Sequence, residues 1–391
     1  MNHKRLLSRI ASLFLVMLVS AACGAAQPTL TPVPPTATPV PATTTPVPAT
    51  PAAVSQDVVA EIDVMLDKMA KQALFTGSVL IGQRGEVLLA QGYGLADRVQ
   101  GIPNTSQTRF RLASITKQFT AMAILILESQ GKLKVEDPIC NYIPDCPSTW
   151  NSITIDHLLT HTSGIPDFMA SPDFPSIAAT PSAPVQTIAR FRDLPLDFEP
   201  GESWSYSNCG YVVLGYIIEQ VSGQTYEDFL QHSIFTPLKL RDTGYDHNSN
   251  SLAVGYPDAY SSPNHTQPAE FIDMSIPYAA GGLYSTVEDL YRWEQALSTE
   301  QLVPQAYLDE MFAPHAAIPD GGGWAYGYGW FVGTDQGGRP TDRHPGYLSG
   351  FASVIARYPD NGITIIVLSN QQGKDVSSIL DILSKKILGD K

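Results

Sequence analysis

The sequence predicts an α+β fold, within the broader α/β class, whose antiparallel sheet is built from both ends of a domain at residues 55–391. Three observations support this prediction. β-rich segments occur near both ends of that region, helical periodicity dominates between them, and the turn Pro359-Asp360-Asn361-Gly362 joins two apolar β runs. The economical arrangement is one sheet flanked by helices, with a mostly helical region inserted.

The elements follow in order from Ser55. Ser55 and Asp57 precede apolar residues at helical spacing, which predicts a first helix. Residues 77–94 predict two strands joined at Arg84-Gly85. Helical patterns then occupy residues 111–133, 153–162, 210–223, 225–238 and 285–298, strand character returns at 327–333 and 350–370, and a closing helix covers 375–388.

Composition limits the classes of function. Hydrophobic residues make up 43% of the 391 residues, which is enough for a sizeable core. The formal net charge is −14, from 38 acidic and 24 basic residues. Because polyanion binding requires clustered Lys and Arg, and no basic run occurs beyond the first nine residues, we expect no nucleic-acid partner.

The beginning of the chain predicts export. Residues 1–23 open with basic residues, continue with an apolar run too short for a good membrane span, and end in small residues at Cys23, as signal peptides do. Cys23 resembles a lipidated bacterial cleavage site, but Ser20 replaces the usual aliphatic residue, so plain secretion stays open. The Pro/Thr-rich residues 24–54 predict an extended linker to the surface domain.

The remaining cysteines and paired histidines give no metal signature. Cys140 and Cys146 bracket a short loop that an exported chain can close with a disulfide, and two half-buried thiols are the alternative. Cys209 has no evident partner. His157 and His161 have zinc-pair spacing but lack the intervening Glu of a metalloprotease, so we interpret them as core or surface residues. We expect no metal and no cofactor.

Ser114 and Lys117 stand one turn apart where a strongly apolar helix begins. A lysine whose pKa is lowered by burial can take the proton of a serine hydroxyl, and the helix dipole favours the negative charge that develops there. Ser-x-x-Lys also arises by chance in a chain of this length. Ser129 and Lys132 repeat it at the helix exit, where we interpret the copy as a cap.

Two further motifs strengthen this pair. Tyr206-Ser207-Asn208 precedes an apolar helix, and its Tyr hydroxyl could relay a proton while its Asn amide holds a substrate carbonyl. His344-Pro345-Gly346 leads into a β-rich run, where a glycine lets a ligand approach the main chain. Each motif alone would be interpreted as a turn. His161-Thr162-Ser163-Gly164 mimics the third motif but is interpreted as a helix-ending turn.

Together the three motifs, in this order, resemble the signature of the serine β-lactamase and penicillin-binding protein superfamily. The resemblance is closest to the branch of class C β-lactamases, D-alanyl-D-alanine carboxypeptidases and β-lactamase-like esterases, which LLTHTSGIPDF and YAAGGLYSTVEDLYRWEQAL also resemble. It runs from about residue 56 to the end of the chain. It implies a β-lactamase/transpeptidase-like fold with an inserted helical region.

The resemblance also implies roles for the first two motifs. Ser114 would be the nucleophile that forms an acyl-enzyme. Lys117 and Tyr206 would share the general-base and proton-relay work. Asn208 would bind the substrate amide or help to position Lys117.

The third motif would line the pocket. His344 and Gly346 would border it, and the backbone N–H groups of Ser114 and Tyr347 would form the oxyanion hole. Pro345 replaces the Thr or Ser whose hydroxyl often helps to bind a substrate carboxylate. His344 in place of Lys resembles the carboxypeptidases and esterases more than the dedicated β-lactamases.

These inferences predict a metal-free exported serine hydrolase that attacks an amide or ester in a small molecule or peptide. A peptidoglycan-type D-amino-acid peptide ranks first and a small ester second. A non-catalytic module that binds peptides or the cell wall is the alternative of another class, but such a module would not need both Lys117 and Tyr206. We expect a monomer that contacts the membrane only through a lipid on Cys23.

Overall fold

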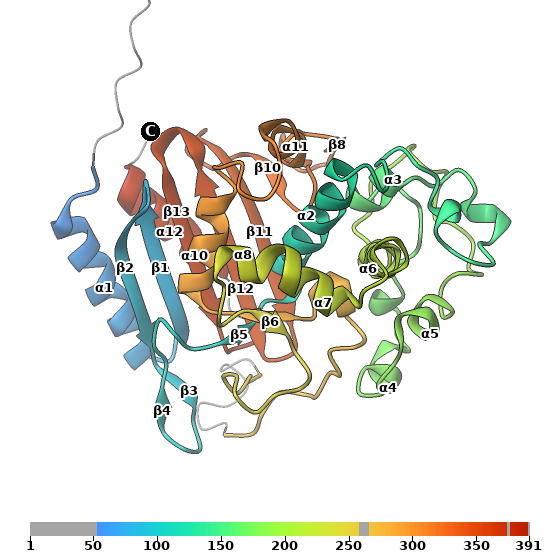
Figure 1. Ribbon diagram of the computed structural model, residues 1–391. Helices are drawn as coiled ribbons and strands as arrows, with labels where there is room; N and C mark the ends of the chain where they lie inside the picture. Colours follow the sequence, from blue (N-terminus) through green and yellow to red (C-terminus); the bar gives the residue numbers. More distant parts are fainter. Residues whose placement is uncertain (1–52, 258–265, 374–375, 390–391) are drawn as a thin grey trace, which may run out of the picture. The chain divides into compact units, whose positions relative to one another are not determined.

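The computed structural model describes residues 53–257, 266–373 and 376–389 (Figure 1). The predicted signal peptide with Cys23 and the predicted linker, apart from its last two residues, lie outside the described residues. Among the helices of the described part, none is long and apolar enough to cross a membrane.

An eight-stranded antiparallel sheet forms the centre of the fold. Its strand order is β2-β1-β13-β12-β11-β10-β9-β8, so β1 from the start of the domain pairs with β13 from its end. This confirms the predicted sheet. The strands are β1 (Gly77–Gln83), β2 (Glu86–Tyr93), β8 (Ala316–Ala317), β9 (Ala325–Tyr326), β10 (Phe331–Thr334), β11 (Pro340–Leu348), β12 (Phe351–Tyr358) and β13 (Ile363–Ser369).

Helices cover both faces of this sheet. α1 (Gln56–Lys71), which Ser55 caps as predicted, and α12 (Val376–Leu388) pack on one face. α10 (Val287–Ala296) packs on the other face against β1 and β13. Because successive side chains in a strand point to opposite faces, strands buried on both sides must be apolar throughout. This explains why 363–369 is an almost unbroken apolar run.

The inserted helical region lies to one side of the sheet in Figure 1, in green and yellow. Its central helix, α2 (Thr116–Ser129), is buried from Thr116 to Leu127, as expected for a helix whose central residues are apolar on all sides. The other helices are α3 (Ile155–Leu159), α4 (Phe174–Ile177), α5 (Pro184–Ile188), α6 (Asn208–Ser222), α7 (Tyr226–Leu230), α8 (Thr236–Leu238), α9 (Tyr278–Gly281) and α11 (Gln305–Met311).

Two small sheets complete the described structure. One pairs β3 (Leu95–Asp97) with β4 (Ile102–Pro103), and the other has the order β5-β7-β6. β5 (Phe110–Arg111) leads directly into the turn before α2, and it pairs with β7 (Leu283–Ser285), which also pairs with β6 (Gly244–Tyr245). The small β5-β7-β6 sheet therefore ties the start of α2 to the segment that follows α9.

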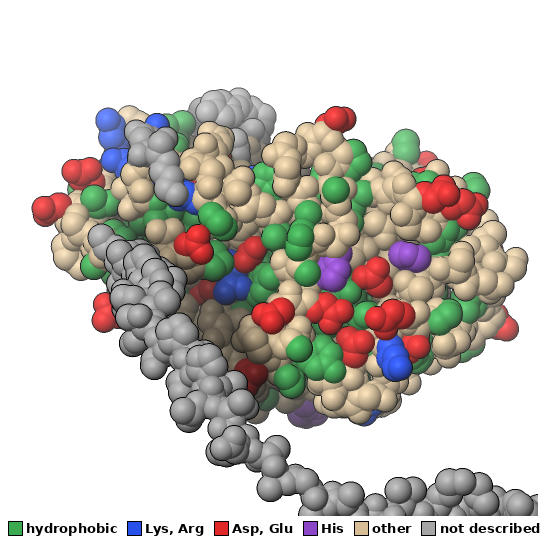
Figure 2. Space-filling model, turned by 90° about the horizontal axis from the view of Figure 1, so that it is seen from above, with side chains coloured by type: hydrophobic (Ala, Val, Ile, Leu, Met, Phe, Trp, Pro, Cys, Tyr) green, Lys and Arg blue, Asp and Glu red, His purple; other side chains and the backbone are tan. Residues whose placement is uncertain are grey.

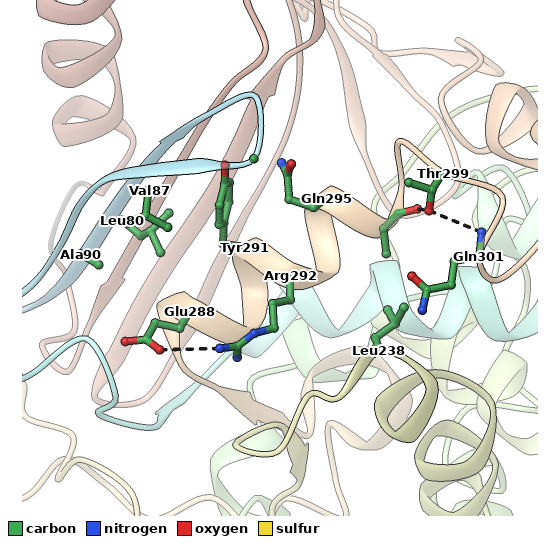
Figure 3. A pocket seen from close by; sticks show the side chains of 12 residues that line it. Leu80, Val87, Ala90, Leu238, Glu288, Tyr291, Arg292, Gln295, Thr299 and Gln301 are labelled. Atoms are coloured by element: carbon green, nitrogen blue, oxygen red, sulfur yellow. Dashed lines mark hydrogen bonds and ion pairs between the residues drawn. The ribbon is translucent and has the colours of Figure 1, made fainter. Parts of the chain in front are cut away.

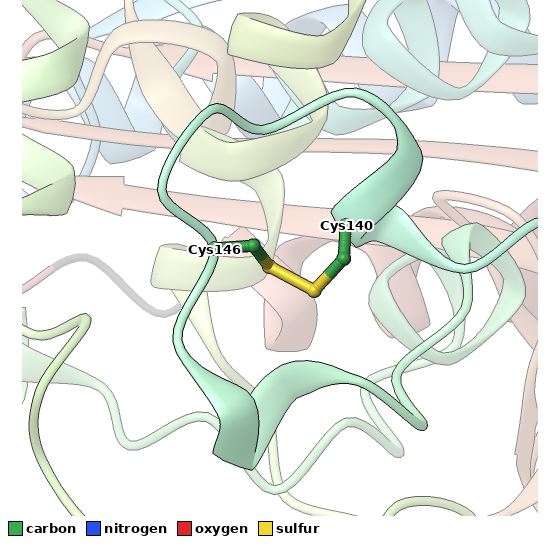
Figure 4. Close-up of a disulfide and its surroundings, with 2 residues drawn as sticks. All are labelled: Cys140 and Cys146. Atoms are coloured by element: carbon green, nitrogen blue, oxygen red, sulfur yellow. A yellow bond between two sulfur atoms is a disulfide. The ribbon is translucent and has the colours of Figure 1, made fainter.

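Cys140 and Cys146 form a disulfide with their Cα atoms 5.3 Å apart (Figure 4). The sequence left a disulfide or two half-buried thiols open, and the structure shows the disulfide. It closes a short loop between two helical turns of the helical region. Cys209 is free and buried, within α6.

Acidic side chains are spread over the face of the molecule in Figure 2, and basic side chains are sparse on much of it. This distribution agrees with the formal net charge of −14. A polyanionic partner would require a continuous basic surface, and this face does not provide one.

Candidate active site

Ser114 lies in a sharp turn at the start of α2. It belongs to a 3₁₀ turn, Ala113–Ile115, that runs directly into the helix. Ala113 has a φ of 49°, a left-handed conformation that costs a residue other than glycine about 1–3 kcal/mol. Ser353 on β12 donates a hydrogen bond from Oγ to the Leu112 carbonyl at 2.8 Å. The buried helix and this contact hold the serine in place.

The amine of Lys117 connects three parts of the site. Its Nζ lies 2.8 Å from Asn208 Oδ1, 2.9 Å from the Ala280 carbonyl oxygen and 3.3 Å from Ser114 Oγ. A neutral amine has two N–H groups, and the two carbonyl oxygens can accept both of them. The nitrogen lone pair is then left for the proton of Ser114.

Burial gives Lys117 the protonation state that this chemistry needs. The side chain is fully buried, and burial lowers its pKa to about 7, against smaller opposing effects of Asp167 and Cys209. A general base works best when its pKa lies near the pH at which it operates. Lys117 can therefore take the Ser114 proton at neutral pH.

Tyr206 lies against the same amine, with Lys117 Nζ 4.8 Å from the centre of its ring. Burial raises the pKa of Tyr206, and the nearby Ser114 hydroxyl lowers it again in part. Among the described residues the Tyr206 hydroxyl has no fully formed hydrogen bond. It is therefore available to pass a proton between Ser114 and a leaving group.

His161 holds the chain on both sides of Tyr206. Its carbonyl accepts from the Ser205 N–H at 3.0 Å, and its Nδ1 accepts from the Ser207 N–H at 3.2 Å. The rings of His161 and Tyr206 are 4.3 Å apart at their centroids. Burial lowers the pKa of His161 well below its ordinary value, and the charge of Lys117 lowers it further.

The prediction that His161 belongs to a helix-ending turn is confirmed, because it follows α3 with a φ of 63°. Its contact with Tyr206 is a structural role that the sequence analysis missed. His157 caps the start of α3. Across residues 53–257, 266–373 and 376–389, no group of three or more His, Cys, Asp or Glu side chains is arranged to hold a metal ion.

Asn208 is the first residue of α6, and its amide joins Lys117 to Asp167. Its Oδ1 accepts from Lys117, and its Nδ2 donates to Asp167 Oδ2 at 2.7 Å. Of the two roles expected for Asn208, these contacts favour the positioning of Lys117. Asp167 was not among the residues predicted from the sequence, although it lies within the stretch LLTHTSGIPDF.

His344 is buried behind Tyr206, with ring centroids 6.2 Å apart. Its Nε2 lies 2.8 Å from the Tyr326 hydroxyl, and its Nδ1 lies 2.6 Å from the Pro345 carbonyl. Because a carbonyl only accepts, the network assigns the proton to Nδ1 and makes Tyr326 the donor to Nε2. Burial and the charge of Lys117 lower the pKa of His344 to about 3, so at neutral pH it carries no charge.

Gly346 packs directly against the turn that carries Ser114, Ala113–Ile115. A Cβ atom at this position would lie 2.4 Å from the Leu112 carbonyl oxygen, 2.5 Å from Ser353 Oγ and 3.0 Å from the Ser114 nitrogen. The main chain that approaches Gly346 closely is therefore that of Leu112 and Ser114. Any side chain at 346 would have to displace the backbone that carries Ser114.

Replacing Gly346 by alanine is expected to slow acylation of Ser114 by about 100-fold, because small displacements of reacting groups are costly in rate. The second-order rate constant for labelling by a reactive acyl probe measures the effect. Gly210→Ala is the matched control, because a Cβ atom at this position of α6 would make only ordinary van der Waals contacts, with Leu158 of α3. Equal labelling rates for the two variants would show that Gly346 does not seat the nucleophile.

The third motif lies within β11, whereas the sequence analysis placed it before the β run. β10 pairs with β11 only at residues 340–343, so beyond that point β12 is the neighbour that pairs with β11. Proline is tolerated in a strand where its missing N–H would face an open edge. Since N–H groups two residues apart point to the same side of a strand, Pro345 and Tyr347 share this edge. The Tyr347 side chain is exposed.

A cavity of about 550 Å³ lies between the β1–β2 hairpin and α10 (Figure 3). Its lining includes Leu80, Val87 and Tyr291, with the ion pair of Arg292 and Glu288 at its edge. None of the predicted site residues lines it. Convergence of reactive groups, and not cavity volume, therefore marks the candidate site around Ser114.

Comparison with known proteins gives consistent matches. Residues 62–386 match the Beta-lactamase family. The chain is 31% identical over 336 residues to penicillin-binding protein 4* of Bacillus subtilis strain 168, covering 82% of this chain and 73% of that protein. It is similar to the octameric penicillin-binding protein homologue of Pyrococcus abyssi, with a TM-score of 0.75, 30% identity and coverage of 85% and 78% of the two chains. The D-amino acid amidase of Ochrobactrum anthropi SV3 gives a TM-score of 0.75 at 27% identity, with coverage of 85% and 98%.

Proposed function

The chain belongs to the serine β-lactamase and penicillin-binding protein superfamily, and from that premise we propose that it is an exported hydrolase that works through an acyl-serine intermediate. The observation that carries this proposal is the Lys117 nitrogen, which is held by two carbonyl oxygens and lies 3.3 Å from Ser114 Oγ. A buried amine with a pKa of about 7 in that position is suited to activating an alcohol.

The reaction has two halves. Ser114 Oγ attacks the acyl carbon while its proton passes to Lys117, and Tyr206 relays a proton to the leaving group as the acyl bond breaks. This relay returns Lys117 to its neutral form. Water then attacks the acyl-serine and gives up a proton to Lys117, and that proton passes to Ser114 Oγ as the acid is released. The N–H groups of Ser114 and Tyr347 would hold the oxyanion. The open edge that Tyr347 shares with Pro345 supports this role.

The first candidate substrate is a peptidoglycan-type peptide that contains D-amino acids, as in a D-alanyl-D-alanine carboxypeptidase. The similarity to penicillin-binding proteins and to a D-amino acid amidase supports this choice. The reaction would be cleavage of an amide next to a D-residue.

The second candidate is an esterase or amidase whose substrate has no carboxylate beside the scissile bond. The observation in its favour is the buried, uncharged His344, whose two nitrogens are both engaged within the protein. Pro345 next to it offers no hydroxyl. A carboxylate would therefore find neither a positive charge nor a hydroxyl on this motif.

Two matched peptides separate these candidates. One is diacetyl-Lys-D-Ala-D-Ala, and the other is the same peptide with a C-terminal amide. Both candidates predict an acyl-enzyme, detected by intact mass spectrometry. The first predicts that the rate falls when the carboxylate is masked, and an unchanged rate would overturn it in favour of the second. A strict requirement for the free acid would identify a carboxypeptidase and overturn the second candidate.

A p-nitrophenyl ester and a fluorescent penicillin complete the comparison. If the ester alone is hydrolysed, the protein is an esterase. Absence of any adduct from all four compounds would overturn the enzymatic proposal in favour of a binding module. Export, lipidation of Cys23 and the monomeric state remain predictions from the sequence.

A further inference from the structure

The groups around Lys117 form a chain of contacts that ends in a carboxylate. Asp167 Oδ2 accepts from Asn208 Nδ2 at 2.7 Å, Asn208 Oδ1 accepts from Lys117 at 2.8 Å, and Lys117 lies 3.3 Å from Ser114. The carboxylate does not reach the nucleophile. Its influence on Ser114 has to pass through the amide and then the amine.

The amide of Asn208 can satisfy both neighbours in only one orientation. Its carbonyl must face the amine and its NH₂ group must face the carboxylate, because a carboxylate accepts only and the Lys117 amine, whose lone pair is left for Ser114, donates to Asn208. A flipped amide would place NH₂ against the Lys117 amine and oxygen against oxygen at Asp167. Asp167 thus fixes which end of Asn208 meets the base.

Asp167 is itself held firmly. Its Oδ1 accepts from the Met169 N–H at 3.1 Å, where it caps a short 3₁₀ turn, and Cys209 Sγ lies 3.7 Å away. The carboxylate is thereby anchored by the loop after α3 and faces the first turn of α6. A rigid anchor is what a group needs if it is to orient another side chain.

From this geometry we propose that Asp167 is a positioning residue, which sets the orientation of Asn208 and through it the position and basicity of Lys117. The inference rests on the proposed function of Ser114 and Lys117 and deepens it. It resembles the way a buried carboxylate orients the base of a catalytic triad. Here the intermediary is an amide and the base is an amine.

The charge of Asp167 acts on Lys117 in a definite direction. Burial lowers the pKa of Lys117 to about 7, and Asp167 opposes that fall. The other titratable groups that face Lys117 come from α6, β11 and the segments after α3 and before α6, namely Cys209, Tyr211, His344, His161 and Tyr206. Burial keeps the two histidines uncharged at neutral pH and raises the pKa of the thiol and both phenols.

Asp167→Asn removes this charge with little change of volume. We expect the pKa of Lys117 to fall by about one unit, so the acidic limb of acylation moves to lower pH. The plateau rate falls about 10-fold because Asn208 can now take either orientation. Asp173→Asn is the matched control, because Asp173 lies in the same loop with an exposed side chain.

The exchange variant Asp167→Asn/Asn208→Asp provides the opposite result. It places the carboxylate directly against Lys117, so the pKa of Lys117 is expected to rise by one unit or more. The acidic limb then moves to higher pH. Circular dichroism and the melting temperature establish that each variant is folded before its profile is compared.

The readout that separates this inference from the proposed function is NMR. The ¹³Cε signal of Lys117 in protein labelled with ¹³C-lysine, assigned by its loss in Lys117→Met, reports the titration without any substrate. Opposite displacements of the midpoint in the two folded Asp167 variants support the positioning role. An unchanged midpoint in both would overturn it, even if the wild type is acylated. Displaced midpoints without any acylation would instead retain the role and reject the hydrolase.

Discussion

Replacing Ser114 by alanine is expected to reduce acyl-enzyme formation by more than about 10⁴-fold, because alanine removes the hydroxyl that is proposed to accept the acyl group. The turn should survive, since Ala113 and Ile115 are buried and α2 is packed on all sides. Intact mass spectrometry after incubation with a fluorophosphonate or a fluorescent penicillin measures the adduct. Peptide mapping then places it on the 3₁₀ turn.

The chain supplies its own control for this experiment. Ser129 and Lys132 repeat the Ser-x-x-Lys spacing at the end of the same helix, where both side chains are exposed and Ser129 donates to the Ile126 carbonyl. Ser129→Ala should label like the wild type. Equal labelling of Ser114→Ala would show that another residue is acylated and would refute the site.

Replacing Lys117 by methionine is expected to slow acylation by about 10³-fold or more while the protein becomes more stable. The rate falls because methionine fills the same space but cannot accept the Ser114 proton. In the wild type, acylation should rise with pH through about 7, as Lys117 loses its proton. This rise with pH should be absent from the residual acylation rate of Lys117→Met. It should be retained in Lys132→Met.

The direction of the stability change follows from proton linkage. The pKa of Lys117 is about 7 in the folded protein, against an ordinary value of 10.5 when the chain is unfolded. Between these values the unfolded chain binds the extra proton, so the wild type becomes more stable as pH rises. Lys117→Met should therefore show its largest gain in melting temperature below pH 7, and the gain should vanish toward 10.5. A large loss of stability at every pH would identify Lys117 as structural.

Elements with strong periodicity were predictable from the sequence. The capped helix at Ser55, the hairpin at Arg84-Gly85 and the last hairpin all appear as predicted, because their local signals agree with the tertiary fold. The helix predicted over 153–162 is shorter, Ile155–Leu159, because His161 turns left-handed to reach Tyr206.

The supporting residues of the site were not predictable in the same way. The spacing of Ser114 and Lys117 is a local signal, since three residues make nearly one helical turn. Ala280 contacts Lys117 directly and Asp167 contacts it through Asn208, both from segments distant in sequence. A single carboxylate or carbonyl carries no pattern of its own. His344 shows the other limit. Its motif is visible in the sequence, but its lack of charge follows from burial and from the charge of Lys117, which only the fold reveals.

The order of the strands has a consequence for how this protein acquires activity. Gly346 and Ser353, which pack against the turn that carries Ser114, lie on strands near the end of the chain. β1 also cannot pair with β13 until β13 has been synthesised. A chain emerging amino-terminus first from a ribosome or a translocation channel would thus hold its nucleophile and base long before the strands that seat them have appeared. On the proposed function, such a precursor would be inert until synthesis and passage are nearly complete, and hydrolysis would be confined to the compartment where the last strands pair.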